Sequence, residues 1–278
     1  MDADRPVRTA LITGAGSGIG AATVHQFLDG GWSVWATDVT SRALEGLPAE
    51  CERTALDVTD PDRIEAVVDR VVTEDGRLDC LVNNAGFAVP GALADVPPEA
   101  MREVFDVMVH GPHDLIRATL PHLRETGGTV VNVSSVLGRS AYPGLGTYCS
   151  AKFALEGMTD ALRLEVGDAV DVVAVEPAWV DTDFAETARE GLDRVDRSAA
   201  YEDVYELYGE ESVLEGGLLA VSPERVARTI VGVATTAAPS ARYPVGWVAR
   251  AIVAARCLPD PIEDWSRRRL APLIARYL

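Results

Sequence analysis

The chain has 278 residues, 47% of them hydrophobic, which suits one large α/β domain or two small ones with a sizeable core. Its net charge of −18 and pI of about 4.6 describe a surface that repels nucleic-acid phosphates and anionic lipid, so we expect neither as a partner. We expect a cytoplasmic protein, because no apolar run reaches the roughly 18–20 residues of a membrane span and the acidic, polar start is unlike a signal peptide. The four cysteines and four histidines show no metal-ligand spacing, so we expect no metal.

The first half of the chain alternates strand and helix patterns around one glycine-rich turn. That turn reads Thr13-Gly14-Ala15-Gly16-Ser17-Gly18-Ile19-Gly20. A strand, such a turn and a helix together present backbone N–H groups and a helix N-terminus to a pyrophosphate. The alternative is a flexible glycine loop, which the flanking strand and helix disfavour. We expect strands over 7–13, 33–37, 53–56 and 78–82, and helices from the turn to Leu28 and from Asp60-Pro61 onward, with Asp60 as N-cap.

Asp38 ends the second predicted strand, about 20 positions past the glycine turn. A carboxylate there is placed to accept hydrogen bonds from an adenosine ribose. It would repel a 2′-phosphate as a like charge, so we expect NAD as the cofactor rather than NADP. The alternative is an ordinary N-cap or turn aspartate. Small residues after the fourth strand, Asn83-Asn84-Ala85-Gly86, let the backbone approach a flat ring.

The second half continues the alternation. Pro97-Pro98-Glu99 opens a long helix that we expect to run toward Leu120, ahead of Pro121. The next strand places Ser135 just past its carboxyl end, where ligands bind in open α/β sheets. Three further strands and a helix that Ser222 caps are expected, over 128–134, 170–175, 242–246 and 223–236. The order predicts an α/β fold: a single domain over 1–278 with a doubly wound, Rossmann-type parallel sheet of about seven strands and helices on both faces.

Tyr148 and Lys152 lie four residues apart, which on a helix puts them one turn apart on one face. Lys152 is the only lysine among the 25 basic residues. A phenol has an ordinary pKa of about 10, and a close ammonium lowers that pKa by roughly 1–3 units. With Ser135 holding the oxygen, these residues predict proton transfer to or from an alcohol or carbonyl oxygen. The alternative is an ordinary solvated helix face.

Two later segments stand apart from the alternation. Residues 186–215 carry ten carboxylates against three arginines. They follow a strand end, so we expect either a substrate lid over about 185–220 or a solvated surface insert. The Arg-rich, amphipathic stretch over 247–278 is expected to be a C-terminal extension.

The motifs occur in one order: Thr13-Gly14-x-x-x-Gly18-x-Gly20, Asp57, Asn83-Asn84-Ala85-Gly86, Ser135, Tyr148-x-x-x-Lys152 and Pro177-x-x-Val180-x-Thr182. In this order, over about residues 7–240, the chain resembles the short-chain dehydrogenase/reductase family. The stretch from Tyr148 to Gly157 looks like the branch acting on steroids, retinoids and other apolar alcohols. The family forms dimers and tetramers, so the resemblance implies a homodimer or homotetramer.

The resemblance implies an NAD-dependent oxidoreductase with Ser135, Tyr148 and Lys152 as catalytic residues. Tyr148 would be the general acid/base, Lys152 would bind the nicotinamide ribose and lower the pKa of Tyr148, and Ser135 would steady the substrate oxygen. Asp57 and Val58 would flank the adenine, and Val180 and Thr182 would meet the carboxamide. The implied cofactor-binding residues are Gly14, Ser17, Gly18, Ile19, Gly20, Asp38, Asp57, Val58, Asn84, Ala85, Gly86, Tyr148, Lys152, Pro177, Val180 and Thr182.

Apolar residues near the predicted strand ends indicate a hydrophobic secondary alcohol and its ketone, or an aldehyde, as substrates. The substrate candidates are Val136, Leu137, Leu145, Trp179 and Phe184, with Phe87, Val89, Tyr142, Pro143 and Trp247 as further wall residues. The alternative is that several of them simply pack the core.

Two positions depart from the family pattern. Pro177 is followed by Ala178 where the family usually has glycine, and Met108 stands where the family has a fourth catalytic residue, an asparagine. The second departure favours an alternative function, a catalytically weak NAD-binding regulatory or scaffold protein. A hydrolase with Ser135 as nucleophile is disfavoured, because no Gly-x-Ser-x-Gly elbow surrounds it.

Overall fold

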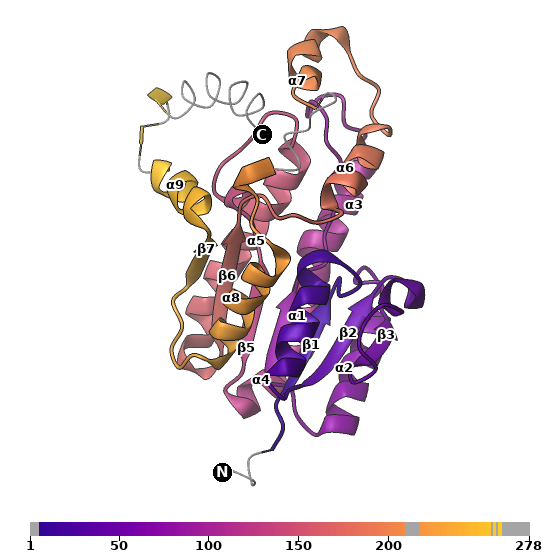
Figure 1. Ribbon diagram of the computed structural model, residues 1–278, viewed down its shortest axis with the longest axis vertical. Coiled ribbons are helices and arrows are strands. Elements are labelled where there is room, and N and C mark those ends of the chain that lie inside the picture. Colours follow the sequence, from indigo (N-terminus) through magenta and orange to yellow (C-terminus); the bar gives the residue numbers. More distant parts are fainter. Residues whose placement is uncertain (1–5, 209–216, 257, 260, 263–278) are drawn as a thin grey trace.

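A seven-stranded parallel sheet forms the centre of the protein, with strand order β3-β2-β1-β4-β5-β6-β7. The computed structural model describes residues 6–208, 217–256, 258–259 and 261–262. The strands are β1 (Thr9–Thr13), β2 (Ser33–Asp38), β3 (Glu52–Ala55), β4 (Cys80–Asn83), β5 (Thr129–Val133), β6 (Asp171–Pro177) and β7 (Arg242–Val245). They run upward in Figure 1. The chain reverses its direction of winding between β1 and β4, so the predicted doubly wound fold is confirmed.

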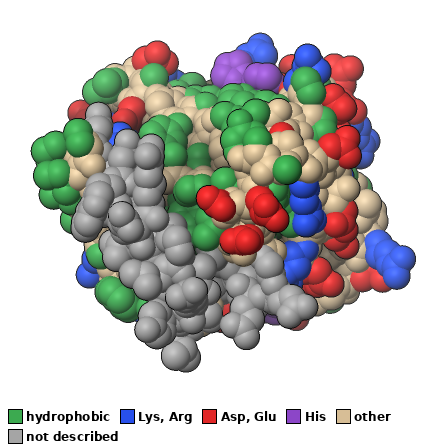
Figure 2. Space-filling model, turned by 90° about the horizontal axis from the view of Figure 1, so that it is seen from above, with side chains coloured by type: hydrophobic (Ala, Val, Ile, Leu, Met, Phe, Trp, Pro, Cys, Tyr) green, Lys and Arg blue, Asp and Glu red, His purple; other side chains and the backbone are tan. Residues whose placement is uncertain are grey.

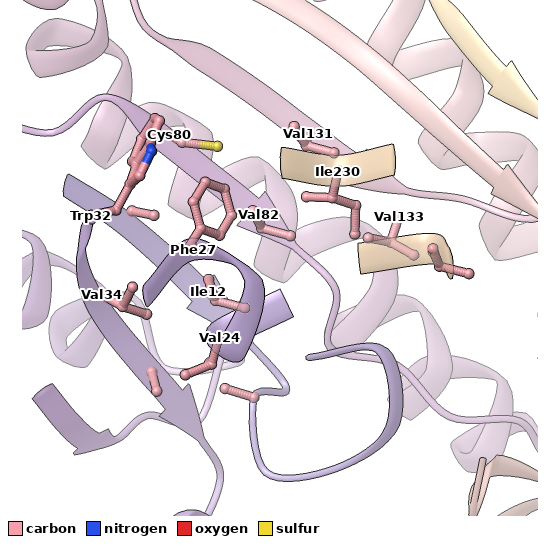
Figure 3. Packing of buried hydrophobic residues seen from close by; sticks show 14 of the residues in the cluster. Ile12, Val24, Phe27, Trp32, Val34, Cys80, Val82, Val131, Val133 and Ile230 are labelled. Atoms are coloured by element: carbon pink, nitrogen blue, oxygen red, sulfur yellow. The ribbon is translucent and has the colours of Figure 1, made fainter. Parts of the chain in front are cut away.

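Helices cover both faces of this sheet. Helices α1 (Gly18–Asp29) and α8 (Pro223–Thr235) lie on one face, and α2 (Pro61–Asp75), α4 (Gly111–Thr126) and α5 (Gly146–Val166) lie on the other. Successive residues of a strand point to opposite faces of the sheet. Leu11 therefore packs in the core beneath α2, α4 and α5, and Ile12 packs in the core beneath α1 and α8. Figure 3 shows the core between the sheet and helices α1 and α8, where the rings of Phe27 and Trp32 meet edge to face with centroids 4.9 Å apart.

The two helix N-termini predicted at Asp60 and Ser222 are capped differently. The Asp60 side chain accepts a 3.1 Å hydrogen bond from the Arg63 N–H, as an N-cap should. The Ser222 side chain makes no capping bond, because it hydrogen-bonds the Glu224 carboxylate instead. The helix begins at Pro223 all the same, with proline in its first turn.

The helix predicted to stop before Pro121 does not stop there. Helix α3 (Pro98–Phe105) passes through a π-helical turn at Asp106–His110 directly into α4, which ends only at Thr126. Pro121 lies on the exposed face of α4, where water can satisfy the Arg117 carbonyl that the proline cannot serve. A proline on a wet helix face therefore did not terminate the helix.

Beyond the carboxyl ends of the strands stand α6 (Phe184–Leu192) and α7 (Glu202–Glu206), with α9 (Trp247–Ala255) after β7 (Figure 1). Three residues of the 185–208 segment, Ala188, Leu192 and Tyr208, are buried against Leu145 and Cys149. The described part of the predicted lid is therefore packed on the protein. Its remainder at 209–216, Cys257 and most of the predicted extension, 263–278, lie outside the described residues. Within the described ranges no helix is both long and apolar enough to span a bilayer.

Candidate active site

A cavity of about 1000 Å³ opens at the carboxyl ends of the strands. It is lined by every predicted catalytic and cofactor-binding residue except Gly20, and by all five principal substrate candidates. Figure 2 looks onto this end of the molecule and shows hydrophobic side chains gathered around a hollow, with acidic side chains beside it. The fold thus brings together predicted residues as distant in the sequence as Gly14 and Phe184.

The glycine turn is shaped by close approaches that no larger residue allows. Gly14 and Gly18 have positive φ values of 61° and 50°. A Cβ on Gly14 would lie 2.8 Å from the Ala85 Cα, and one on Gly18 would lie 2.9 Å from the Thr182 Cγ2. A Cβ on Gly20 would lie 2.0 Å from the Gly14 carbonyl oxygen. Gly20 therefore lies behind the cavity wall and permits the fold of the turn.

Asn84 ties this turn to the end of β4. Its Nδ2 donates to the carbonyl oxygens of Thr13 at 3.0 Å and Gly14 at 2.9 Å. In return the Thr13 hydroxyl accepts from the N–H groups of Asn84 at 3.1 Å and Ala85 at 3.2 Å. The Asn84 amide is thus used within the protein, and it holds the turn open toward the cavity.

The two candidate carboxylates on the nucleotide side are held differently. Asp38 Oδ2 accepts from the Gly16 N–H at 2.9 Å and Oδ1 from the Val39 N–H at 2.8 Å, which fixes the carboxylate beside the glycine turn. Asp57 Oδ1 accepts from both the N–H and the hydroxyl of Thr59, at 2.9 and 2.7 Å. Asp38 is therefore tied to the glycine turn and Asp57 to the turn before α2, and both carboxylates line the cavity.

The three predicted catalytic side chains meet at the ends of β5 and α5. Ser135 follows β5, and its Oγ accepts from the Leu137 N–H at 3.1 Å and hydrogen-bonds the Tyr148 hydroxyl. Lys152 lies one turn after Tyr148 on α5. The Lys152 Nζ donates to the Val133 carbonyl oxygen at 2.7 Å and lies 5.6 Å from the centroid of the Tyr148 ring.

Burial pushes both ionisable members of this trio toward their neutral forms. It raises the pKa of Tyr148 above its usual range, and the hydrogen bond from Ser135 only partly offsets this. It lowers the pKa of Lys152 to about 8, against the opposing charge of Glu156. The expected lowering of the tyrosine pKa by the lysine is not seen here, because the lysine Nζ lies over the ring and bonds a carbonyl oxygen.

The apolar walls largely come from the predicted positions. Phe87 and Tyr142 line the cavity together with the five principal candidates. Val89 instead packs in the core at 1% exposure, and Trp247 is 69% exposed on α9. Pro143 is exposed and its carbonyl oxygen accepts from the Tyr208 hydroxyl at 2.5 Å. These three wall predictions were wrong because proximity to a strand end does not determine which way a side chain points.

Met108 lies inside the π-helical turn and is 1% exposed. Its side chain packs with Ala151 of α5, and its Cγ is 3.3 Å from where a Cβ on Gly86 would stand. His110 does not take its place, since it is exposed and its Nδ1 lies 2.9 Å from the Asp106 Oδ1. Met108 thus fills the space behind the cavity floor with an apolar side chain.

Sequence reasoning missed two groups of residues. Ile252 and Ala255 of α9 and Thr187 of α6 also line the cavity, and no motif marks them. Glu176 is fully buried on β6, where a carboxylate inside a run of valines was a usable signal. It belongs to an ionic cluster behind the catalytic trio.

Comparisons with known proteins agree with this architecture. The sequence profile of the short chain dehydrogenase family matches residues 8–193. The 3-oxoacyl-[acyl-carrier-protein] reductase FabG of Thermotoga maritima is 37% identical over 188 residues, 64% of this chain and 76% of that protein. The uncharacterized oxidoreductase YusZ of Bacillus subtilis is 32% identical over 86% of this chain and 89% of its own length.

A crystal structure of a short-chain dehydrogenase from Streptomyces avermitilis superimposes with a TM-score of 0.79 at 29% identity, covering 95% of this chain and 96% of that one. The sequence profile alone spans well over half of the chain, and the structural likeness extends over almost all of it. The protein therefore belongs to the short-chain dehydrogenase/reductase family of oxidoreductases.

Proposed function

We propose that the protein is an NAD-dependent oxidoreductase that interconverts a hydrophobic secondary alcohol and its ketone, or an aldehyde. The observation that carries this proposal is the meeting of Ser135, Tyr148 and Lys152 at one end of a largely apolar cavity. Membership of the family supports the oxidoreductase class, and the NAD preference and the substrate class are the finer parts of the proposal.

The residues at the other end of the cavity fit a dinucleotide. The glycine turn and the N-terminus of α1 would hold the pyrophosphate, and Asp38 would accept from the adenosine ribose. The missing Cβ atoms at Gly14 and Gly18 let this turn pack directly against Ala85 and Thr182, which line the same cavity. Val180 and Thr182 line the wall toward the catalytic trio, where they would meet the carboxamide.

When bound, the nicotinamide supplies or accepts the hydride. The protein's own residues handle the oxygen and its proton. Tyr148 gives a proton to the carbonyl oxygen in reduction and takes it from the alcohol in oxidation, and Ser135 holds that oxygen. Lys152 acts as an ammonium that favours the phenolate form of Tyr148 once the two approach.

The substrate class is tested by a matched panel of ketones and alcohols, followed by the absorbance of the reduced nicotinamide. We expect kcat/KM to rise about fourfold for each added methylene that the walls bury, since one buried methylene contributes about 0.8 kcal/mol. Free sugars and small organic acids serve as the comparison. Should these polar compounds prove the best substrates, the apolar assignment is wrong.

The charges that line the cavity restrict the expected substrates further. In the described lining of the cavity, Lys152 is the one basic side chain, against five acidic ones: Asp38, Asp57, Glu103, Asp106 and Asp183. The name of the relative FabG describes a substrate whose 3-oxoacyl chain is attached to a carrier protein. Here we expect uncharged substrates, so neutral ketones should outperform ketones of equal size that carry a carboxylate. The steroid and retinoid branch is one such neutral class and stays a prediction.

Met108 is the one observation that favours the second candidate function, a weakly catalytic NAD-binding protein. We nevertheless expect an active enzyme whose proton-transfer step is slower, because methionine keeps the main-chain carbonyl and the π-helical turn but cannot orient a water. Met108→Asn should keep turnover or raise it, and any deficit of the wild type should be smaller than the roughly 10²–10⁴-fold cost of a lost acid/base group. The measurement is kcat on the best apolar substrate.

Met101→Asn on α3 is the matched control for this variant, because Met101 lies on the same continuous helix but outside the π-helical turn that holds Met108. Thermal melting checks that the buried amide of the Met108 variant has not unfolded the protein. If the wild type turns over no apolar alcohol or ketone while Met108→Asn does, the NAD-binding candidate replaces the enzyme.

A further inference from the structure

A buried ionic cluster lies next to Lys152, and the proposed reaction gives it no role. Its centre is two carboxylates, Glu156 on α5, 5% exposed, and Glu176 on β6, fully buried. The Arg242 Nε reaches both, at 3.1 Å from the Glu156 Oε2 and 3.5 Å from the Glu176 Oε1. The Arg139 Nη1 lies 3.4 Å from the same Glu176 oxygen.

Each of these carboxyl groups has one oxygen without a hydrogen-bond partner in the part of the chain that the structure describes, Glu156 Oε1 and Glu176 Oε2. Two ionised carboxylates that share one arginine in a dry site are costly, and binding one proton relieves both the repulsion and the desolvation. Burial and the charge of Glu156 raise the pKa of Glu176 to about 7, although Arg139 and Arg242 oppose the rise.

Glu156 follows Lys152 by four residues on α5, so the two lie one turn apart on the same face. Burial lowers the pKa of Lys152, and Glu156 is the charge that raises it again. The next carboxylate along the helix, Asp160, is taken up by arginines: its Oδ2 lies 2.5 Å from the Arg242 Nη2 and its Oδ1 lies 2.7 Å from the Arg163 Nη2. On the cavity side, the Lys152 Nζ lies over the ring of Tyr148 and donates to the Val133 carbonyl oxygen.

We propose that Glu156, buried one helical turn from Lys152 and held by Arg242, is the counter-charge that keeps Lys152 an ammonium. Glu156 is then a positioning residue, which acts on the reaction only through Lys152. The catalytic value of this charge rests on the proposed function, whereas the charge pairing itself does not.

The experiment uses the solitary lysine of the chain. Lysine labelled with carbon-13 at Cε gives a single side-chain signal in the full-length protein, and its chemical shift against pH reports the protonation midpoint of Lys152. Glu156→Gln keeps an oxygen for Arg242 but removes the charge, so the midpoint should fall by about one pH unit or more, as for the loss of a close opposite charge. Glu176→Gln removes the charge of the other buried carboxylate, which is not among the groups that raise the pKa of Lys152, and should leave the midpoint near that of the wild type.

Asp160→Asn is the matched control, because it removes a charge from the same helix and from the same Arg242 but lies two helical turns from Lys152. Its midpoint should match the wild type. An unchanged midpoint in Glu156→Gln, or an equal fall in Glu176→Gln or Asp160→Asn, overturns the proposal.

If Glu156→Gln does not fold, Glu156→Asp carries the test. It retains the charge, so a midpoint well below that of the wild type would show that charge is not what matters. None of these readouts needs turnover. A missing dehydrogenase activity with an intact Glu156 effect would therefore refute the proposed function and leave this inference standing.

Discussion

Replacing Tyr148 with phenylalanine should abolish turnover while leaving NAD binding nearly intact. The substitution removes the hydroxyl that hydrogen-bonds Ser135 but keeps the ring, which meets Phe184 edge to face at 5.5 Å. Loss of a general acid/base group costs roughly 10²–10⁴-fold in rate, and no other hydroxyl of the trio can supply the proton at the same point. Turnover is measured by nicotinamide absorbance, and NAD binding by calorimetry.

Tyr142→Phe is the control for this variant. Tyr142 also lines the cavity, its hydroxyl has no hydrogen-bond partner among the described residues, and burial raises its pKa to about 12. We expect near-normal turnover from it. A Tyr148→Phe protein that keeps more than about a tenth of the wild-type rate would remove Tyr148 from the proton step, since that loss lies below the roughly 10²–10⁴-fold range.

NAD should bind far more tightly than NADP. The carboxylate of Asp38 is fixed beside the glycine turn by the N–H groups of Gly16 and Val39, so it cannot easily turn away from a 2′-phosphate. Two like charges about 4 Å apart at an effective dielectric near 20 repel by about 4 kcal/mol before screening, which corresponds to about a thousandfold in Kd. Raising the ionic strength should narrow the difference.

Asp38→Asn keeps an oxygen for the turn and removes the charge, so the ratio of the two dissociation constants should fall most of the way to one. Asp57→Asn provides the comparison, because Asp57 also lines the cavity but is engaged by Thr59. It should leave the ratio as it was. Comparable dissociation constants of the wild type for NAD and NADP would contradict the assignment.

The fold was predictable because its signals are local. Central strands such as β1 and β4 are buried on both faces and are short apolar runs, and the turns after them begin with Gly14 and with Asn84-Ala85-Gly86. All seven predicted strands are present, with ends within two residues of the expected positions. The residues of the trio were found for the same reason, since Tyr148 and Lys152 share one helix and Ser135 follows a strand end.

What could not be predicted depends on contacts between distant segments. The π-helical turn at 106–110 has no residue pattern of its own, and Pro121 is tolerated only because its face of α4 is wet. The direction of the pKa shift at Tyr148 depends on burial, which spacing along a helix does not reveal. The cluster around Glu176 joins α5, β6 and β7, and only the finished sheet brings these together.

Because the only lysine is buried, its rate of chemical modification can measure how often the protein opens around it. Lys152 is 5% exposed at the base of the cavity, and every other basic residue of the chain is an arginine. A small acylating reagent can reach this side-chain amine only when the base of the cavity opens to solvent. If the reagent acts faster than the opening recloses, the rate of lysine acylation equals the opening rate; if slower, it reports the equilibrium population of the open form.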